Sequence, residues 1–212
     1  MSQYNVGAPS ERVAMDILGP LPESESGNKY LLLVADYFTK WPEAYALPNQ
    51  EATTVAEVFV REYVCRFGVP LELHSDQGRN FESKVFREMC TLLGIKKTRT
   101  TPLHPQSDGM IERMNRTLEA QLSKFVDDHH RDWDYYIPYL MMALRSATHE
   151  STKCTPAMMQ FGRELCLPID LLLGRPEEPI PMLSYTEKVQ QSLEQVRKRK
   201  SAAGVGQDEG LL

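Results

Sequence analysis

The sequence lacks any long hydrophobic run. No uninterrupted apolar segment is longer than the one at residues 30–35, whereas a membrane-spanning helix needs about 20 apolar residues. The first ten residues also lack the basic and apolar blocks of a secretory signal peptide, so we expect neither a membrane partner nor secretion. With 212 residues, of which 42% are hydrophobic and 25% charged, the composition indicates one globular domain followed by a tail.

Cysteine is scarce and lacks the spacing of a metal or disulfide motif. Four cysteines occur, at positions 65, 90, 154 and 166, without a CxxC pair. This arrangement argues against a zinc knuckle and against a disulfide framework. We therefore expect buried free thiols in a reducing compartment.

The chain as a whole also lacks a net positive charge. The formal net charge of −5 argues against a generic nucleic-acid coat protein, which would be basic overall. Residues 84–116, however, contain seven basic and three acidic side chains, so this window carries +4 and the rest of the chain −9. A local basic strip therefore remains compatible with a nucleic-acid partner.

Short apolar segments alternate with helical periodicities along most of the chain. We predict strands at residues 12–18, 29–36, 43–47, 71–75 and 95–100. We predict helices at residues 53–67, 83–93, 108–126, 133–148, 156–162 and 185–200, with a loop-rich segment at 168–181. Pro138 is expected to bend its helix or to delay its start. This order predicts a mixed α/β sheet with helices on its faces.

Three aspartates stand in or directly after predicted strands. Asp16 and Asp36 interrupt or end apolar segments, and Asp76 precedes the turn-forming pair Gln77-Gly78. A buried carboxylate is costly unless it is paired, hydrogen-bonded or bound to a metal. Aspartate is also a preferred turn residue, so each of the three can equally be a strand-end or turn cap.

Glu112 falls in the first turns of the predicted helix that begins at residue 108. An acid there favours the helix dipole and can pair with Arg116. Glu112 follows Asp76 with 35 residues between them, but the same spacing separates Asp36 from Glu72 and Asp128 from Glu164. The spacing alone is therefore weak evidence. A converging set of carboxylates can hold two divalent ions about 3.5–4 Å apart that assist phosphoryl transfer.

Four sequence blocks provide the context that the spacing lacks. They are residues 11–20 (ERVAMDILGP), 34–42 (VADYFTKWP), 67–81 (FGVPLELHSDQGRNF) and 100–118 (TTPLHPQSDGMIERMNRTL). In this order the chain resembles, from about Glu11 to Gly162, the catalytic core of a gypsy-type LTR retrotransposon (retroviral-like) integrase. The resemblance implies an RNase H-like fold, with a mixed five-stranded sheet whose first three strands are antiparallel and whose faces are covered by helices.

The resemblance also implies a site. Its D,D-35-E carboxylates correspond to Asp16, Asp76 and Glu112, which are expected to be catalytic and to bind two Mg²⁺ or Mn²⁺ ions. Asp36 matches a family position that is not a metal ligand, and we interpret it as structural or supporting. The aromatic cluster at residues 37–41 is interpreted as core and turn packing.

DNA contacts are expected from the loop and the helix around Glu112. The resemblance and the phosphate-binding habit of basic side chains suggest His104, Gln106, Asn115, Arg116 and Lys124. Arg116 can equally pair with Glu112 or Glu119. The basic run at residues 197–200 fits a solvated helix end, a nuclear-import patch or a phosphate contact.

We therefore divide the chain into a linker (residues 1–10), an RNase H-like integrase core (11–165) and a tail (166–212). The expected function is DNA integration in the nucleus, by metal-dependent 3′-end processing and strand transfer of retroelement DNA into target DNA. A homodimer or higher oligomer is expected. The alternative interpretation is a domesticated or truncated, non-catalytic DNA-binding or dimerisation module. A hydrolytic nuclease of the RNase H type would share the metal ions, but the block at residues 104–112 resembles the integrase pattern and not that one.

Overall fold

The computed structural model describes residues 7–99, 109–125 and 131–174, together with residues 191 and 194. The strands are β1 (Arg12–Leu18), β2 (Tyr30–Asp36), β3 (Pro42–Leu47), β4 (Glu72–Ser75) and β5 (Lys96–Arg99). The helices are α1 (Ala52–Val58), the π-helix η1 (Phe59–Val64), α2 (Cys65–Phe67), α3 (Lys84–Leu92), α4 (Gly109–Phe125), α5 (Trp133–Ser146), α6 (Pro156–Phe161) and α7 (Asp170–Leu173). Within these ranges no helix is both long and apolar enough to cross a membrane.

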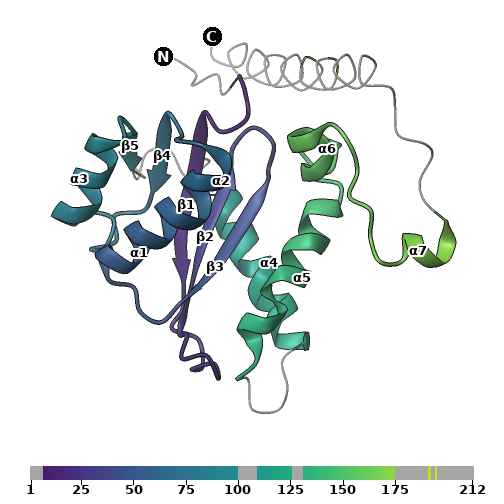
Figure 1. The fold of residues 1–212 in the computed structure, drawn as a ribbon, viewed down its shortest axis with the longest axis horizontal. Helices are drawn as coiled ribbons and strands as arrows, with labels where there is room; N and C mark the ends of the chain where they lie inside the picture. Colours follow the sequence, from purple (N-terminus) through teal and green to yellow (C-terminus); the bar gives the residue numbers. More distant parts are fainter. Residues whose placement is uncertain (1–6, 100–108, 126–130, 175–190, 192–193, 195–212) are drawn as a thin grey trace, which may run out of the picture.

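The five strands form one mixed sheet in the order β3-β2-β1-β4-β5 (Figure 1). Strands β1, β2 and β3 are an antiparallel meander, whereas β4 runs parallel to β1 and β5 runs parallel to β4. This topology confirms the predicted α/β sheet with three antiparallel strands first. It also sets the carboxyl ends of β1 and β4 next to each other, at the position where open sheets usually bind ligands.

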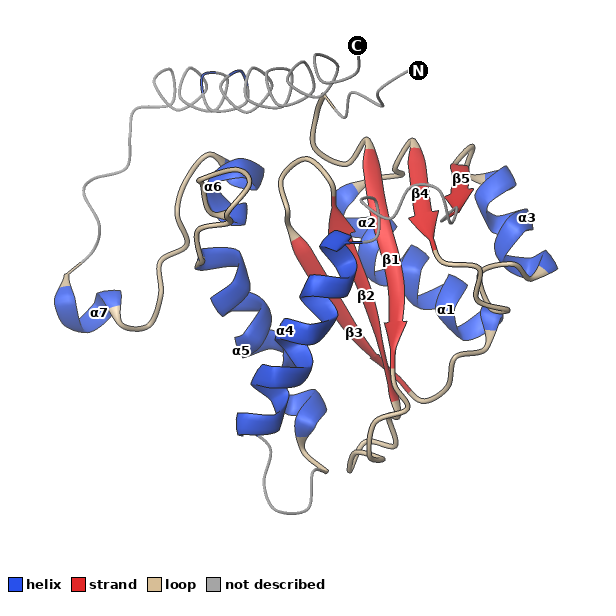
Figure 2. Cartoon of the chain, turned by 180° about the vertical axis from the view of Figure 1, so that it is seen from behind, coloured by secondary structure: helices blue, strands red, loops and turns tan. Residues whose placement is uncertain are grey.

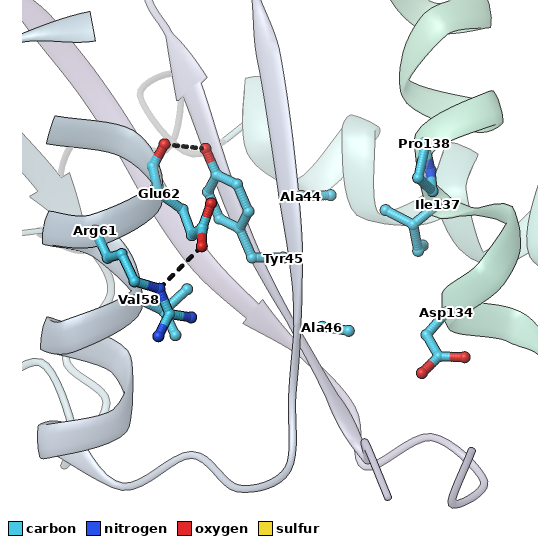
Figure 3. A pocket seen from close by; sticks show the side chains of 9 residues that line it. All are labelled: Ala44, Tyr45, Ala46, Val58, Arg61, Glu62, Asp134, Ile137 and Pro138. Carbon is cyan, nitrogen blue, oxygen red and sulfur yellow. Dashed lines mark hydrogen bonds and ion pairs between the residues drawn. The ribbon is translucent and has the colours of Figure 1, made fainter. Parts of the chain in front are cut away.

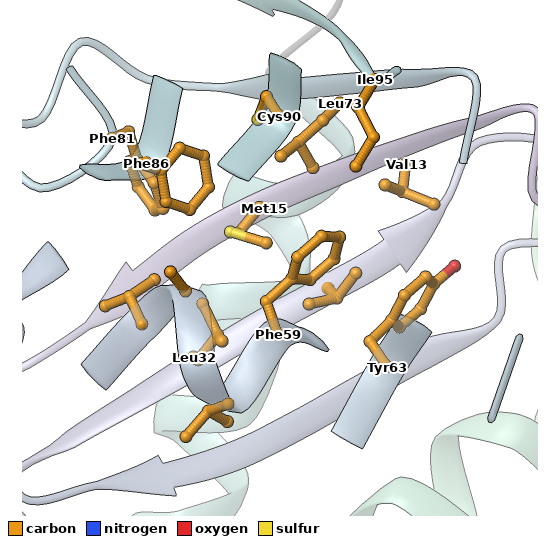
Figure 4. Close-up of a cluster of buried hydrophobic side chains, with 14 of the residues drawn as sticks. Val13, Met15, Leu32, Phe59, Tyr63, Leu73, Phe81, Phe86, Cys90 and Ile95 are labelled. Atoms are coloured by element: carbon orange, nitrogen blue, oxygen red, sulfur yellow. The ribbon is translucent and has the colours of Figure 1, made fainter. Parts of the chain in front are cut away.

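Helices cover the two faces of the sheet, and β1 contributes side chains to both. Since successive residues of a strand point to opposite faces, Val13 and Met15 enter the core formed with α1, η1 and α3 (Figure 4). Ala14 and Leu18 instead pack in the core formed with α4 and α5, the helices in front of the sheet in Figure 2. Asp16 has the parity of Ala14 and Leu18, so it belongs to the α4 face.

Strand β2 is buried on both faces, as its unbroken apolar sequence predicts. Residues 31–34 are fully buried and Ala35 is nearly so. The reason is its place between β1 and β3, with helices on either side. This central strand fixes the register of the antiparallel half of the sheet.

Three predictions about helices need correction. The predicted helix at 53–67 is continuous but contains the π-helical turn η1. Pro138 does not delay the start of α5, which begins at Trp133; the proline lies on the exposed side, where water can reach the carbonyl that loses its donor. The predicted loop at 168–181 contains α7, where Asp170 Oδ2 accepts a 2.6 Å hydrogen bond from the Leu167 N–H.

The prediction of four buried thiols is wrong for two of them. All four cysteines are free, but only Cys90 is buried and Cys154 is half-buried, whereas Cys65 and Cys166 are exposed. Cys65 lies in the last helical turn before Gly68 and is exposed, whereas Val64 and Phe67 of the same turn pack against the core. The predicted helix at 185–200 is described only at Gln191 and Glu194, and the basic run at 197–200 lies outside the described residues.

Candidate functional site

Asp16 lies half-buried on β1 and faces α4. Its Oδ1 accepts a hydrogen bond from the Ile17 N–H at 2.8 Å, and its Oδ2 accepts one from Asn115 Nδ2 at 2.6 Å. These two bonds, one to each oxygen, fix the plane of the carboxylate. An ionised carboxylate has about four acceptor sites, more than these two bonds use.

Asp76 follows β4 directly and is exposed. Its Oδ1 accepts a hydrogen bond from the Gly78 N–H at 2.9 Å. A Cβ at position 78 would lie 2.9 Å from this oxygen and 2.7 Å from Asn80 Oδ1. A side chain at position 78 would therefore displace the Asp76 carboxylate or the Asn80 amide from its present place.

The strand register brings these two aspartates together. In the parallel β1–β4 pair, the last aligned residues are Met15 and Ser75, and Asp16 and Asp76 come directly after them in the sequence. Adjacent strands lie about 4.8 Å apart, and aligned side chains point to the same face. The main chain therefore brings the two aspartates close to each other at the carboxyl ends of β1 and β4, although they are far apart in the sequence.

Helix α4 brings the position of Glu112 to the same place. Glu112 precedes Asn115 by three residues, and positions three apart share one face of a helix. Since Asn115 contacts Asp16, the backbone directs this face toward β1. The side chain of Glu112 itself lies outside the described part of the chain.

The structure describes only some of the residues predicted to contact DNA. His104 and Gln106, as well as the side chain of Lys124, lie outside the described residues. Arg116 is exposed on α4, as a phosphate contact requires. Asn115 directs its amide nitrogen to Asp16, a contact that sequence reasoning missed. Its spacing of three residues from Glu112, on a helix expected to pack against β1, is the signal that could have revealed this contact.

The chemistry of the site fits a divalent cation. Among the described side chains, no group of three His, Cys, Asp or Glu residues has the geometry of a metal site. Asp16 and Asp76 nevertheless supply the hard oxygen donors that Mg²⁺ and Mn²⁺ prefer. Asn115, which bonds to Asp16, has a buried Oδ1 with no hydrogen-bond partner within the described residues. An unpaired acceptor next to carboxylates suits a cation or its bound water.

Asp36 has a different environment and is fully enclosed. Only 2% of its surface is exposed, and it accepts hydrogen bonds from the Ser10 N–H, the Phe38 N–H and both the N–H and the hydroxyl of Thr39. Burial raises the pKa of the Asp36 carboxyl, and these hydrogen bonds act in the opposite direction. The contacts are those of a structural residue. Phe38 and Trp41 are also buried, in agreement with the predicted core packing of this cluster.

A pocket of about 270 Å³ lies elsewhere, along the edge strand β3 (Figure 3). Residues of η1, β3 and α5 line it, among them Glu62, Tyr45 and Ile137. Strands β2 and β1 separate this edge of the sheet from β4. The pocket is therefore distinct from the pair of aspartates.

The topology, with aspartates on β1 and directly after β4, defines an RNase H-like domain. Solved structures share this fold. The catalytic core of HTLV-2 integrase in complex with magnesium aligns with a TM-score of 0.58 at 20% identity, over 71% of this chain and 96% of that one. The BIV integrase core aligns with a TM-score of 0.55 at 26% identity, over 70% of this chain and 91% of that one.

Sequence comparison identifies the family. The model of the integrase core domain matches residues 7–105. The Pro-Pol polyprotein of feline foamy virus is 33% identical over 189 residues, which is 88% of this chain and 16% of that polyprotein. The Pol polyprotein of transposon 412 from Drosophila melanogaster is 29% identical over 158 residues, or 74% of this chain and 13% of that one. The chain belongs to the retroviral and retrotransposon integrase core family, and it spans less than a sixth of these relatives.

Proposed function

We propose that this chain is the catalytic core of a D,D-35-E DNA strand transferase and endonuclease. Asp16, Asp76 and Glu112 are its metal ligands, and two Mg²⁺ or Mn²⁺ ions are its cofactors. The observation that carries the proposal is the β1–β4 register, which brings Asp16 and Asp76 close to each other in an integrase core. The magnesium present in the HTLV-2 integrase core supports the choice of metal.

In this chemistry the chain's own residues bind the metal ions and orient the carboxylates that hold them. Bound magnesium or manganese supplies Lewis acidity at the scissile phosphate and makes the attacking oxygen more acidic. Asp16 and Asp76 hold the positive charge there, while the Ile17 N–H and Asn115 keep the Asp16 carboxylate in one orientation. In 3′-end processing the attacking oxygen comes from water, and in strand transfer from a DNA 3′-hydroxyl. In each step one P–O bond forms and one breaks, the attacking group loses its proton, and the departing 3′-oxygen gains one.

The direct test is strand transfer on a branched DNA that mimics a joined retroelement end. The protein is incubated with this DNA and Mg²⁺ or Mn²⁺, beside Asp76→Asn, which removes a ligand at nearly constant size. Glu88→Gln, on the exposed side of α3, is the control for loss of one negative charge. We expect joined and released strands from the native protein and the control, and at least a 100-fold lower yield from Asp76→Asn.

Two outcomes count against this function. Equal product from Asp76→Asn and native protein excludes Asp76 as a metal ligand. DNA binding without product from any variant favours the non-catalytic DNA-binding or dimerisation module. Neither outcome conflicts with the fold, because the fold alone does not require activity.

DNA is the proposed macromolecular partner, both as retroelement ends and as target, and we propose the nucleus as the location on that basis. The net charge of +4 over residues 84–116 and the exposure of Arg116 support a phosphate-binding surface. Since each lost phosphate contact lowers the salt dependence of binding by about one counterion, Arg116→Ala is expected to reduce the slope of log K against log salt by about one. Glu119→Gln, exposed on the same helix, should leave the slope unchanged or raise it slightly.

Self-association is proposed through the β3 flank. Tyr135 and Tyr139 of α5 are 64% and 52% exposed, and their helix lines the pocket beside the β3 edge (Figure 3). The HTLV-2 integrase core has been solved in dimeric and trimeric forms. We expect the native chain to sediment as a dimer or larger and Tyr139→Lys to shift it toward the monomer; an unchanged mass would place the interface elsewhere.

A further inference from the structure

Asn115 contacts the candidate site without contributing a charge. The bond from its Nδ2 to Asp16 Oδ2 is 2.6 Å long, at the short end for an N–H···O bond. The other oxygen of Asp16 accepts the Ile17 N–H. The carboxylate is therefore held between the main chain of β1 and a side chain of α4.

The orientation of the Asn115 amide follows from the chemistry of its partner. An ionised carboxylate only accepts hydrogen bonds, so the amide nitrogen must face Asp16. The amide oxygen is bonded to the same carbon as this nitrogen and therefore lies next to the carboxylate. It is buried, and no other described residue donates a hydrogen bond to it. Buried polar atoms are nearly always paired, so the oxygen needs an explanation.

We infer that Asn115 is a positioning residue for the metal ion at Asp16. Its amide nitrogen holds the Asp16 carboxylate in the orientation that binds the ion, and its amide oxygen accepts a hydrogen bond from a water molecule bound to that ion. The inference rests on the proposed function, because it requires a divalent metal at Asp16. Groups that orient metal ligands in this way typically change metal affinity 10–100-fold when they are removed.

A purely structural role for Asn115 makes a different prediction. Helix α4 is already attached to the sheet by apolar side chains, since Ile111, Leu118 and Leu122 are buried in the core with β1 and β2. If the Asn115 bond served only to attach α4, its removal would lower stability and leave metal affinity unchanged in the folded protein. Metal affinity therefore separates the two roles.

The test measures Mn²⁺ binding directly, from the free-ion signal in electron paramagnetic resonance, and so does not depend on activity. Four proteins are compared: native, Asp16→Asn, Asn115→Leu and Gln121→Leu. Leucine is close in size to asparagine but neither donates nor accepts. Gln121 is a matched control because it lies on α4 and its Oε1 is likewise buried without a partner among the described groups. Asn115→Gln keeps an amide on a longer side chain and tests for partial rescue.

We expect the native protein and Gln121→Leu to bind Mn²⁺ equally, and Asp16→Asn to lose the site. Asn115→Leu should bind about tenfold more weakly or worse, and Asn115→Gln should recover part of the loss. If a folded Asn115→Leu binds Mn²⁺ with native affinity while Asp16→Asn does not bind it, the inference is overturned and the proposed metal site remains. Absence of an Asp16-dependent site in the native protein overturns both.

A second measurement uses only the native protein, so it does not depend on whether a variant folds. In native protein labelled with ¹⁵N, the side-chain amide resonance of Asn115 is followed during titration with Mg²⁺. We expect this resonance to shift with the same midpoint as the backbone amide of Ile17. A stationary Asn115 amide beside a shifting Ile17 signal contradicts the inference.

Discussion

Asp16 and Asp36 lie on neighbouring antiparallel strands and have opposite surroundings. Asp36 is enclosed, and four donors from residues 10–39 bind its two oxygens. Asp16 is half-buried, lies on the strand next to the one that Asp76 follows, and bonds to Asn115, whose buried amide oxygen has no partner among the described residues. The difference separates two uses of a carboxylate. One that is filled by protein donors stabilises the fold, whereas the proposed metal ligand is held in place for binding, which stability does not require.

Removing Asp36 should have the largest effect on stability. Asp36→Ala leaves four donors without their acceptor, three in the turn at residues 37–41 and one at Ser10. We expect a loss of about 4 kcal/mol in the free energy of unfolding, since buried unpaired donors cost about 1–3 kcal/mol each but relax in part. Urea denaturation measures this. Asp16→Ala is the comparison and should change stability by no more than about 1 kcal/mol. Equal losses from the two variants would remove the distinction between them.

The buried ion pair of Glu43 and Arg145 extends the comparison to a third carboxylate, which is enclosed like Asp36. Arg145 Nη2 lies 2.6 Å from Glu43 Oε1, which also accepts the Trp41 indole N–H at 2.8 Å. Arg145→Met leaves Glu43 charged and only 6% exposed, so we expect a loss of about 3 kcal/mol, within the usual range for one broken buried pair. Arg61→Met, whose ion pairs are exposed, should cost less than about 1 kcal/mol. A similar loss from both would show that burial of the pair does not matter.

The sequence allowed much of this fold to be predicted, because each strand and helix has its own periodicity. Strand β1 was predicted with its observed bounds, whereas α7 was missed, since its turn depends on one local bond to Asp170. For the candidate site, Asp16 and Asp76 came from the family resemblance. Their adjacency depends on the parallel pairing of β1 with β4, which no local pattern encodes. The contact of Asn115 with Asp16 likewise depends on how α4 packs.

Asp134 provides a smaller and pH-dependent effect. Its Oδ2 accepts hydrogen bonds from the Ser24 hydroxyl at 2.7 Å and the Asn28 amide at 2.8 Å. Burial acts to raise the pKa of Asp134, but these hydrogen bonds outweigh it and the pKa lies below its ordinary value of 3.8. The carboxylate therefore stabilises the fold above about pH 4, and this contribution is lost as the pH falls through the lowered pKa.

We accordingly expect Asp134→Asn to be about 1–2 kcal/mol less stable than native protein at pH 7, because two hydrogen bonds are weakened. This difference in the free energy of unfolding should disappear as the pH approaches about 2. Urea denaturation at several pH values measures it. Asp36 should behave in the opposite sense. Because burial raises its pKa, its contribution is largest when it is protonated and falls as the pH rises through that pKa. A constant gap for Asp134→Asn across this range would contradict the assignment.

The smallest expected effect is stabilisation by the metal, and it tests Asp16 directly. A ligand that binds only the folded state at ten times its Kd raises the free energy of unfolding by about 1.4 kcal/mol. Mg²⁺ should therefore raise the unfolding midpoint of the native protein and leave that of Asp16→Asn unchanged. Asp36→Asn, if folded, should keep the full Mg²⁺ effect, because its carboxylate points to the opposite face of the sheet, among donors of the chain itself. Loss of the Mg²⁺ effect in Asp36→Asn, or its persistence in Asp16→Asn, would show that the enclosed carboxylate takes part in binding and that the two aspartates do not divide the roles of folding and binding.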